Sequence, residues 1–147
     1  AGPENLPAVL GFAAADEAWA AKGTAVPDMD GHEAFVDLFR TLNSYGAQQL
    51  MGYGEYVSEI RALAMPNLSA AAQLVRFDMK GFAVSAGSAC ASGTLKQSRV
   101  LEAFGVEPEL AARTIRVSTG WSTTAEDVRR VTDAWIDIAM GAAAKAG

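Results

Sequence analysis

The sequence predicts an α+β fold, a mostly antiparallel sheet of about four short strands packed with helices. The chain has 147 residues, enough for a single domain, and 50% of them are hydrophobic against 20% charged, which is sufficient for one core. Helix-like and strand-like segments are mixed along the chain without a repeat. Two strand-like segments follow each other across a tight turn, which favours antiparallel pairing.

Two helices are expected before the first strand. Residues 4–21 are rich in alanine, and Gly23 follows as a helix end. Residues 32–44 place apolar side chains at helical spacing, at Phe35, Leu38, Phe39 and Leu42. We expect the chain to be one unit, with a leading long helix over 1–22 and a small domain over 24–147.

The middle of the chain predicts a hairpin followed by a helix. Strands are expected over 48–51 and 57–65, because a Gly-Tyr-Gly turn separates them and the second alternates in polarity. A phosphate-binding loop is the weaker interpretation of that turn, since the third glycine and the following helix are absent. Ser69 is a suitable N-cap for a helix over 70–78 that would direct inward Leu74, Val75 and Phe77.

A short strand and a loop of small residues come next. The strand is expected over 82–85, and only Ala, Gly, Ser and Cys occupy 86–93. Thr94 and Gln97 match a capping box that would start a helix running to Phe104.

The last third predicts a short helix, a strand and a long helix. The short helix is expected over 107–112, and 114–118 alternates as a strand. Thr123 and Glu126 match a second capping box, and the helix that follows is expected to fray near Gly141. Its apolar stripe consists of Val128, Val131, Trp135, Ile138 and Ala139.

Composition excludes several classes of partner. Twelve basic against seventeen acidic residues give a net charge of −5, and no basic stripe exists for nucleic acid. No apolar run approaches the ~18 residues that a membrane span needs. A single cysteine and the lack of a leader pattern predict a soluble, cytoplasmic protein.

A metal site is the less favoured interpretation of the acidic residues around His32. Asp28, Asp30 and Glu33 surround this histidine, but Gly31 falls at the wrong position for a calcium-binding loop. Acidic residues before a helix also stabilise its N-terminus without an ion. We therefore expect helix capping and no metal.

Cys90 is the candidate nucleophile. A lone cysteine is often a small buried hydrophobic residue. Its neighbours in 86–93, however, have little apolar area to bury, which predicts a mobile surface loop. A thiol on such a loop would act as a carrier or a swinging nucleophile.

Arg116 is the candidate binding residue. It lies between Ile115 and Val117 in the predicted strand 114–118, where an exposed charge on an edge strand is one interpretation. If the side chain faces inward it needs an anion, and its guanidinium matches a carboxylate in two parallel hydrogen bonds. The residues alone leave both interpretations open.

Three segments resemble those of one known family. The run 82–93, FAVSAGSACASG, followed by LKQSRVL at 95–101, resembles the active-site cysteine loop of NifS/IscS-type cysteine desulfurases in the class V aminotransferase family. Residues 1–11 resemble the family's Gly-Thr-Glu-Asn-x-Pro segment, and 114–118 resemble its Ile-Arg-x-Ser strand. The three segments occur in the family's order.

The resemblance implies the small C-terminal domain of a fold-type I pyridoxal phosphate enzyme that converts L-cysteine to L-alanine. Cys90 matches the residue that forms the persulfide, and Arg116 matches the residue that holds the substrate carboxylate. Pro3 replaces the threonine expected at the cofactor phosphate, and no lysine matches the cofactor lysine, so the large cofactor-binding domain is absent from this chain. The implied partners are a cofactor-domain polypeptide or homodimer partner, and a sulfur acceptor in iron–sulfur cluster assembly.

Two other functions stay open at this point. One is a stand-alone persulfide carrier that relays sulfur on Cys90, and the other is a catalytically silent interaction domain. In each case, a small domain without its large neighbour would expose the apolar side of the first helix. We therefore expect self-association or a partner chain there, through Val9, Leu10, Phe12 and Trp19.

Overall fold

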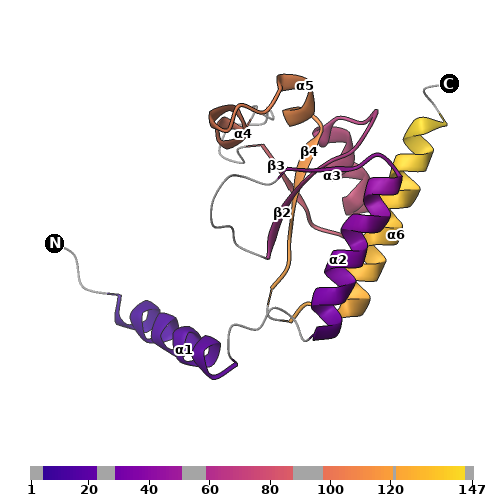
Figure 1. Cartoon of the computed structure of the whole chain (residues 1–147). Helices are drawn as coiled ribbons and strands as arrows, with labels where there is room; N and C mark the ends of the chain where they lie inside the picture. Colours follow the sequence, from indigo (N-terminus) through magenta and orange to yellow (C-terminus); the bar gives the residue numbers. More distant parts are fainter. Residues whose placement is uncertain (1–4, 23–28, 51–58, 88–97, 121, 145–147) are drawn as a thin grey trace.

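The computed structural model (Figure 1) describes five stretches of the chain, namely 5–22, 29–50, 59–87, 98–120 and 122–144, without the side chains of 22 and 29–36. Its elements follow in the order α1 (Leu6–Lys22), α2 (Met29–Ser44), β1 (Gln48–Leu50), β2 (Ile60–Ala64), α3 (Ala70–Met79), β3 (Ser85–Ala86), α4 (Arg99–Ala103), α5 (Pro108–Ala111), β4 (Thr114–Ser118) and α6 (Ala125–Ala143).

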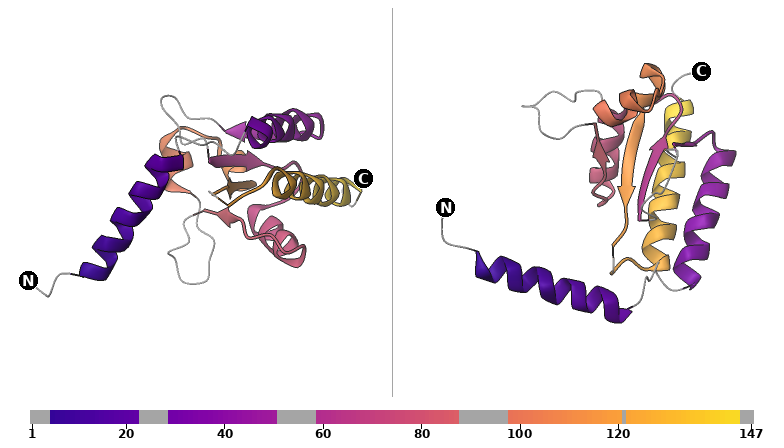
Figure 2. Two further views of the ribbon diagram at one scale, coloured as in Figure 1. Left: turned by 90° about the horizontal axis from the view of Figure 1, so that it is seen from below. Right: turned by 60° about the vertical axis from the view of Figure 1, so that its left-hand side comes forward.

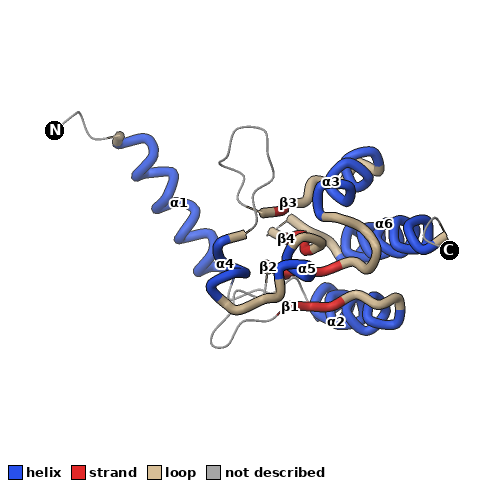
Figure 3. The backbone as a smooth tube through the Cα atoms, turned by 90° about the horizontal axis from the view of Figure 1, so that it is seen from above, coloured by secondary structure: helices blue, strands red, loops and turns tan. Residues whose placement is uncertain are grey.

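The strands form one four-stranded sheet in the order β1-β2-β4-β3, and every pairing is antiparallel. Helices α2, α6 and α3 lie in a row on one face of this sheet, whereas α4 lies on the other side (Figures 2 and 3). The sheet therefore has a covered face and a more open face.

The hydrophobic core lies between the sheet and the row of three helices. Ile115 and Val117 of β4 point into it, and Trp135 and Ile138 of α6 meet them. The stripe predicted for the last helix is confirmed, since Val128, Trp135, Ile138 and Ala139 are buried and Val131 packs partly buried against them. In α2, Leu38 and Leu42 are buried as predicted, with Phe39 partly buried.

Three predicted helix starts are wrong. Helix α2 begins at Met29 rather than 32. Helix α6 has Thr124 as its N-cap, because Thr124 exchanges hydrogen bonds with Asp127, while the Thr123 hydroxyl accepts from the Gly120 amide at 2.9 Å. Helix α4 begins at Arg99, because Ser98 is extended and its hydroxyl caps the Leu101 amide. The predicted capping box at 94–97 lies outside the described residues.

Helix α3 explains why the third strand starts later than predicted. Gly81 has a positive φ of 80°, and the amides of Gly81 and Phe82 donate to the carbonyls of Asp78 and Phe77. This arrangement is a Schellman motif, which uses Phe82 to end the helix. The strand consequently spans Ser85–Ala86 instead of 82–85.

One predicted core side chain of α3 is wrong. Val75 is 61% exposed, whereas Phe77 and Gln73 are fully buried. The predicted N-cap of α3, Ser69, is confirmed by its hydrogen bond from the Ala72 amide.

The final helix, α6, continues past Gly141 to Ala143 rather than fraying at Gly141.

Helix α1 extends away from the sheet and the other helices (Figures 1 and 2). Along its described side chains, all but Ala18 are exposed. Among the described residues, every helix is too short or too polar to span a bilayer. The division into a leading helix over 1–22 and a domain over 24–147 stays a prediction.

Candidate functional site

The open face of the sheet carries a row of four side chains, one from each strand. In β4, Ile115 and Val117 point to the core, so Arg116 between them points to the opposite face. The register places Arg116 directly opposite Ala62 on one side and Ser85 on the other. Leu50 is paired with Ala62 and completes the row.

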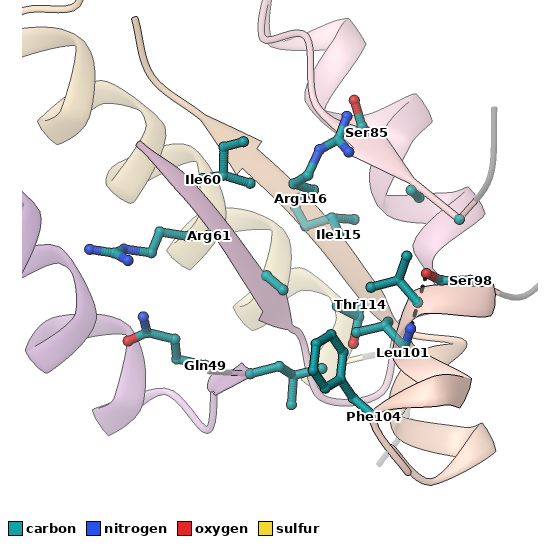
Figure 4. Close-up of a pocket in the computed structure, with 15 residues that line it drawn as sticks. Gln49, Ile60, Arg61, Ser85, Ser98, Leu101, Phe104, Thr114, Ile115 and Arg116 are labelled. Atoms are coloured by element: carbon teal, nitrogen blue, oxygen red, sulfur yellow. Dashed lines mark hydrogen bonds between the residues drawn. The ribbon is translucent and has the colours of Figure 1, made fainter. Parts of the chain in front are cut away.

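A pocket of about 530 Å³ covers this row (Figure 4). Helix α4 forms its apolar wall with Val100, Leu101 and Phe104, and Leu50 and Ile60 add further apolar surface from the sheet. Its polar lining consists of Gln49, Arg61, Ser85, Ser98, Thr114 and Arg116. None of the lining residues that the structure describes is acidic, so their combined charge is positive and suits an anionic ligand.

Arg116 is a lining cation without a counter-charge among the residues that the structure describes. Its side chain is exposed and forms no hydrogen bond or ion pair with the described part of the chain. Arg61 differs, because its guanidinium carbon lies 5.6 Å from the centroid of the Phe39 ring, and Figure 4 shows it directed away from Arg116. β4 lies between β2 and β3, so the interpretation of Arg116 as a charge on an edge strand is wrong.

Two described residues that flank the Cys90 segment line this pocket. They are Gly87 and Ser98, and Ser98 also caps α4. Cys90 itself lies outside the described residues, as does Pro3. Gly87 and Ser98 therefore share a pocket with Arg116, and the roles of Cys90 and Arg116 stay predictions.

The metal alternative gains no support from the described residues. Among them, no group of three or more His, Cys, Asp or Glu side chains could hold a metal ion. The side chains of Asp30, His32 and Glu33 are outside the described part of the structure, as is Asp28.

Sequence reasoning found Arg116 but missed Ser85 and the wall formed by α4. Alternation within 114–118 was enough to single out Arg116. Ser85 lies opposite Arg116 only because β3 pairs with β4. These two residues are 31 positions apart in the sequence, and no local pattern predicts their pairing.

Curated cysteine desulfurases match most of this chain, including the following two. A Bacillus subtilis protein with the provisional name cysteine desulfurase IscS 1 is 35% identical over 133 residues, which cover 88% of this chain and 35% of that protein. A Rhodobacter capsulatus cysteine desulfurase is 33% identical over 133 residues, which cover 89% of this chain and 34% of its own length. The chain resembles NifS/IscS-type cysteine desulfurases. The resemblance predicted from the sequence is thus confirmed.

The fold agrees with that result. A solved structure of a NifS-like protein superposes with a TM-score of 0.76 at 22% identity, covering 94% of this chain and 34% of that one. This match confirms the predicted fold class. The chain spans about a third of the length of its curated relatives, which is consistent with a C-terminal portion. No protein-family profile matches it.

The described residues do not fit pyridoxal phosphate, the cofactor implied by the resemblance. This aldehyde cofactor needs a lysine amine to hold it covalently, and no lysine lines the pocket. The lysine whose side chain is described, Lys80, forms an ion pair with Asp137 of α6, 3.0 Å away. We derive no chemical step through the cofactor from these residues.

Proposed function

We propose that this chain supplies the persulfide-forming thiol and the carboxylate-binding arginine of a cysteine desulfurase. The reaction converts L-cysteine to L-alanine and passes the sulfur to an acceptor. The observation that carries the proposal is an Arg116 guanidinium without a partner among the described residues, in a pocket that is also lined by Gly87 and Ser98 on either side of the Cys90 segment. Similarity to cysteine desulfurases over 88% of the chain supports the same reaction.

Arg116 would bind the substrate carboxylate. Its guanidinium offers two parallel N–H donors that match the two oxygens of a carboxylate, and the bond is stronger because both partners are charged. No acidic side chain occurs in the part of the pocket lining that the structure describes, which leaves this charge available to a ligand. The apolar wall formed by α4 limits water on one side of the pocket, which strengthens such a contact.

Cys90 would accept the sulfur. It is three residues from Gly87, and an extended chain advances at most ~3.6 Å per residue, so its Cα lies within about 11 Å of that of Gly87 in any conformation. The thiolate attacks the substrate sulfur, so the new S–S bond forms as the C–S bond breaks. The carbon that loses sulfur takes up a proton and becomes the methyl group of alanine.

The carbon that loses sulfur keeps the electron pair of the broken C–S bond until it takes up a proton. The group that stabilises this electron pair would be supplied by another polypeptide. Pyridoxal phosphate supplies this stabilisation when it is bound, and the described residues here offer no anchor for it. The partners of the reaction are therefore a cofactor-bearing chain or homodimer partner, and a sulfur acceptor that builds iron–sulfur clusters, in the cytoplasm.

The test combines this chain with a cofactor-bearing polypeptide of a cysteine desulfurase and L-cysteine. The wild-type chain should yield alanine, and mass spectrometry should find one additional sulfur atom on Cys90. Cys90→Ala should form no persulfide. Arg116→Ala should raise KM for L-cysteine roughly a hundredfold, as expected for loss of a charge-assisted contact of about 2.7 kcal/mol.

Arg129→Ala is the matched control, because Arg129 is an exposed arginine of α6 that pairs with Glu126 at 3.1 Å and does not line the pocket. No alanine from the wild-type mixture would contradict the proposal. If Cys90 nevertheless takes sulfur from a small persulfide donor, the result would instead favour the relay function.

A further inference from the structure

Ser85 stands beside Arg116 on the open face of the sheet. The antiparallel register pairs the two residues directly, so their Cβ atoms lie about 5 Å apart. Both side chains are exposed, and both line the pocket. Figure 4 shows the Arg116 side chain directed towards Ser85. The pair thus places a hydroxyl and a guanidinium at one location.

Neither of these two side chains forms a hydrogen bond with the described residues. Within the described stretches of the chain, the Ser85 hydroxyl forms no hydrogen bond, and Arg116 forms none either. Of the other lining hydroxyls, Thr114 donates its proton to the Leu110 carbonyl at 2.7 Å. The Ser98 hydroxyl accepts from the Leu101 amide and keeps its own proton, but Ser98 precedes α4 and is not on the row of Arg116. Ser85 is therefore the hydroxyl on that row that can donate to a ligand of Arg116.

The residues beside Arg116 on the β2 side limit where a ligand of Arg116 can form further hydrogen bonds. Ala62 faces Arg116 from β2, and Leu50 follows it from β1; neither offers a side-chain donor. A carboxylate at Arg116 can accept about four hydrogen bonds, and a guanidinium fork supplies two of them. On this row, a third donor can come only from the side of Ser85.

We infer that Ser85 is a second binding residue for the substrate carboxylate, donating its hydroxyl proton to an oxygen that Arg116 also holds. The inference rests on the proposed function for the identity of the ligand, the carboxylate of an α-amino acid. The hydroxyl makes the same contact before and during the reaction. Its loss should therefore raise KM and leave kcat unchanged.

The kinetic experiment uses the assembled enzyme described above. Ser85→Ala should raise KM for L-cysteine about tenfold, because it removes one hydrogen bond to a charged group. Ser85→Thr keeps a hydroxyl in a strand position and should restore most of the affinity. Ser118→Ala is the matched control, an exposed serine on the same face of β4 that does not line the pocket.

Three kinetic results would overturn the inference. The first is an unchanged KM in Ser85→Ala. The second is an equal rise in KM in Ser118→Ala, which would indicate a general effect on the sheet. The third is a fall in kcat without a change in KM, which would place Ser85 in the chemical step or in folding rather than in binding.

A titration of this chain alone separates the inference from the proposed function. L-alanine added to the wild-type chain should shift the NMR signal of the Arg116 Nε–H group, and L-alaninamide, which lacks the carboxylate, should not. Ser85→Ala should weaken the response to L-alanine several-fold. If the assembled enzyme makes no alanine, the desulfurase proposal fails while this titration still tests the carboxylate site. No wild-type response, or an equal response in Ser85→Ala, would overturn the inference.

Discussion

At the scale of single residues, the availability of Arg116 follows from its position in a central strand. A charged side chain between two buried neighbours must leave the sheet on the face that the helices do not cover. Among the described residues, the pocket lining on that face contains no acidic side chain. An exposed ion pair at this position would add little to the stability of the fold. The fold therefore loses little by leaving Arg116 available to a ligand.

Asp127 links the stability of the fold to pH. The backbone amide of Thr124 donates to its carboxylate at 3.0 Å and the Thr124 hydroxyl at 2.7 Å. These bonds, helped by Arg130, hold the pKa of Asp127 below its ordinary value of 3.8. Because the pKa of Asp127 is lower in the folded protein than in the unfolded chain, its ionised carboxylate stabilises the fold at every pH above the unfolded pKa. This stabilisation is lost as the pH falls through the folded pKa.

Asp127→Asn should therefore lower Tm at neutral pH and change it little once the pH is below the folded pKa of Asp127. Thermal unfolding followed by circular dichroism across that range measures the effect. Asp133→Asn provides the comparison, since Asp133 is an exposed aspartate of the same helix. A constant difference in Tm between wild type and Asp127→Asn at every pH would show that the carboxylate charge is not responsible.

At the scale of elements, Gln73 joins α3 to the start of β4. Its side-chain amide donates to the Leu68 carbonyl at 3.0 Å and to the Arg113 carbonyl at 2.7 Å, and the residue is fully buried. The Met65 amide donates to the same Arg113 carbonyl. The residue just before the strand that carries Arg116 is thus held both by α3 and by the residue that follows β2.

Gln73→Ala should reduce the free energy of unfolding by about 2–4 kcal/mol, because it removes two buried hydrogen bonds and leaves a cavity. Urea denaturation measures this change. Gln73→Met keeps most of the volume and isolates the hydrogen bonds, and Gln48→Ala tests an exposed glutamine of β1. Gln73→Met also removes the Gln73 Oε1, which is buried without a partner among the described residues. A Gln73→Met protein as stable as the wild type would therefore show that the two bonds contribute no more than this buried oxygen costs.

The same helix illustrates how far sequence patterns predict this fold. Its N-cap, Ser69, was predictable because capping depends on residues close in sequence. The burial of Gln73 was not, because the carbonyl that satisfies its amide belongs to a residue forty positions away. Arg116 and Ser85 repeat this contrast: alternation within a strand revealed the first, and strand pairing was needed for the second.

At the scale of the whole molecule, α1 is the element that the rest of the fold leaves uncovered. Leu6, Val9 and Leu10 are each 61% exposed, and Phe12 is 77% exposed. These side chains contribute little to the core while they face water. Exposed apolar side chains at this density on one helix favour association.

The isolated chain should therefore self-associate as its concentration rises, because pairing through α1 removes these side chains from water. Sedimentation velocity over a concentration series measures the change in mass. Phe12→Glu combined with Val9→Glu should shift the population towards monomer. Met79→Glu changes an equally exposed apolar residue of α3 and should not. A wild-type chain that stays monomeric throughout the series would refute this expectation.

The short outer strands determine how the sheet itself behaves in such assemblies. In the described residues, the sheet is bordered by a three-residue strand, β1, and a two-residue strand, β3. So few unpaired backbone groups are a poor template for adding strands from another molecule, which is the usual route to fibrils. Oligomers of this chain should consequently keep a native sheet and dissociate on dilution, rather than mature into amyloid.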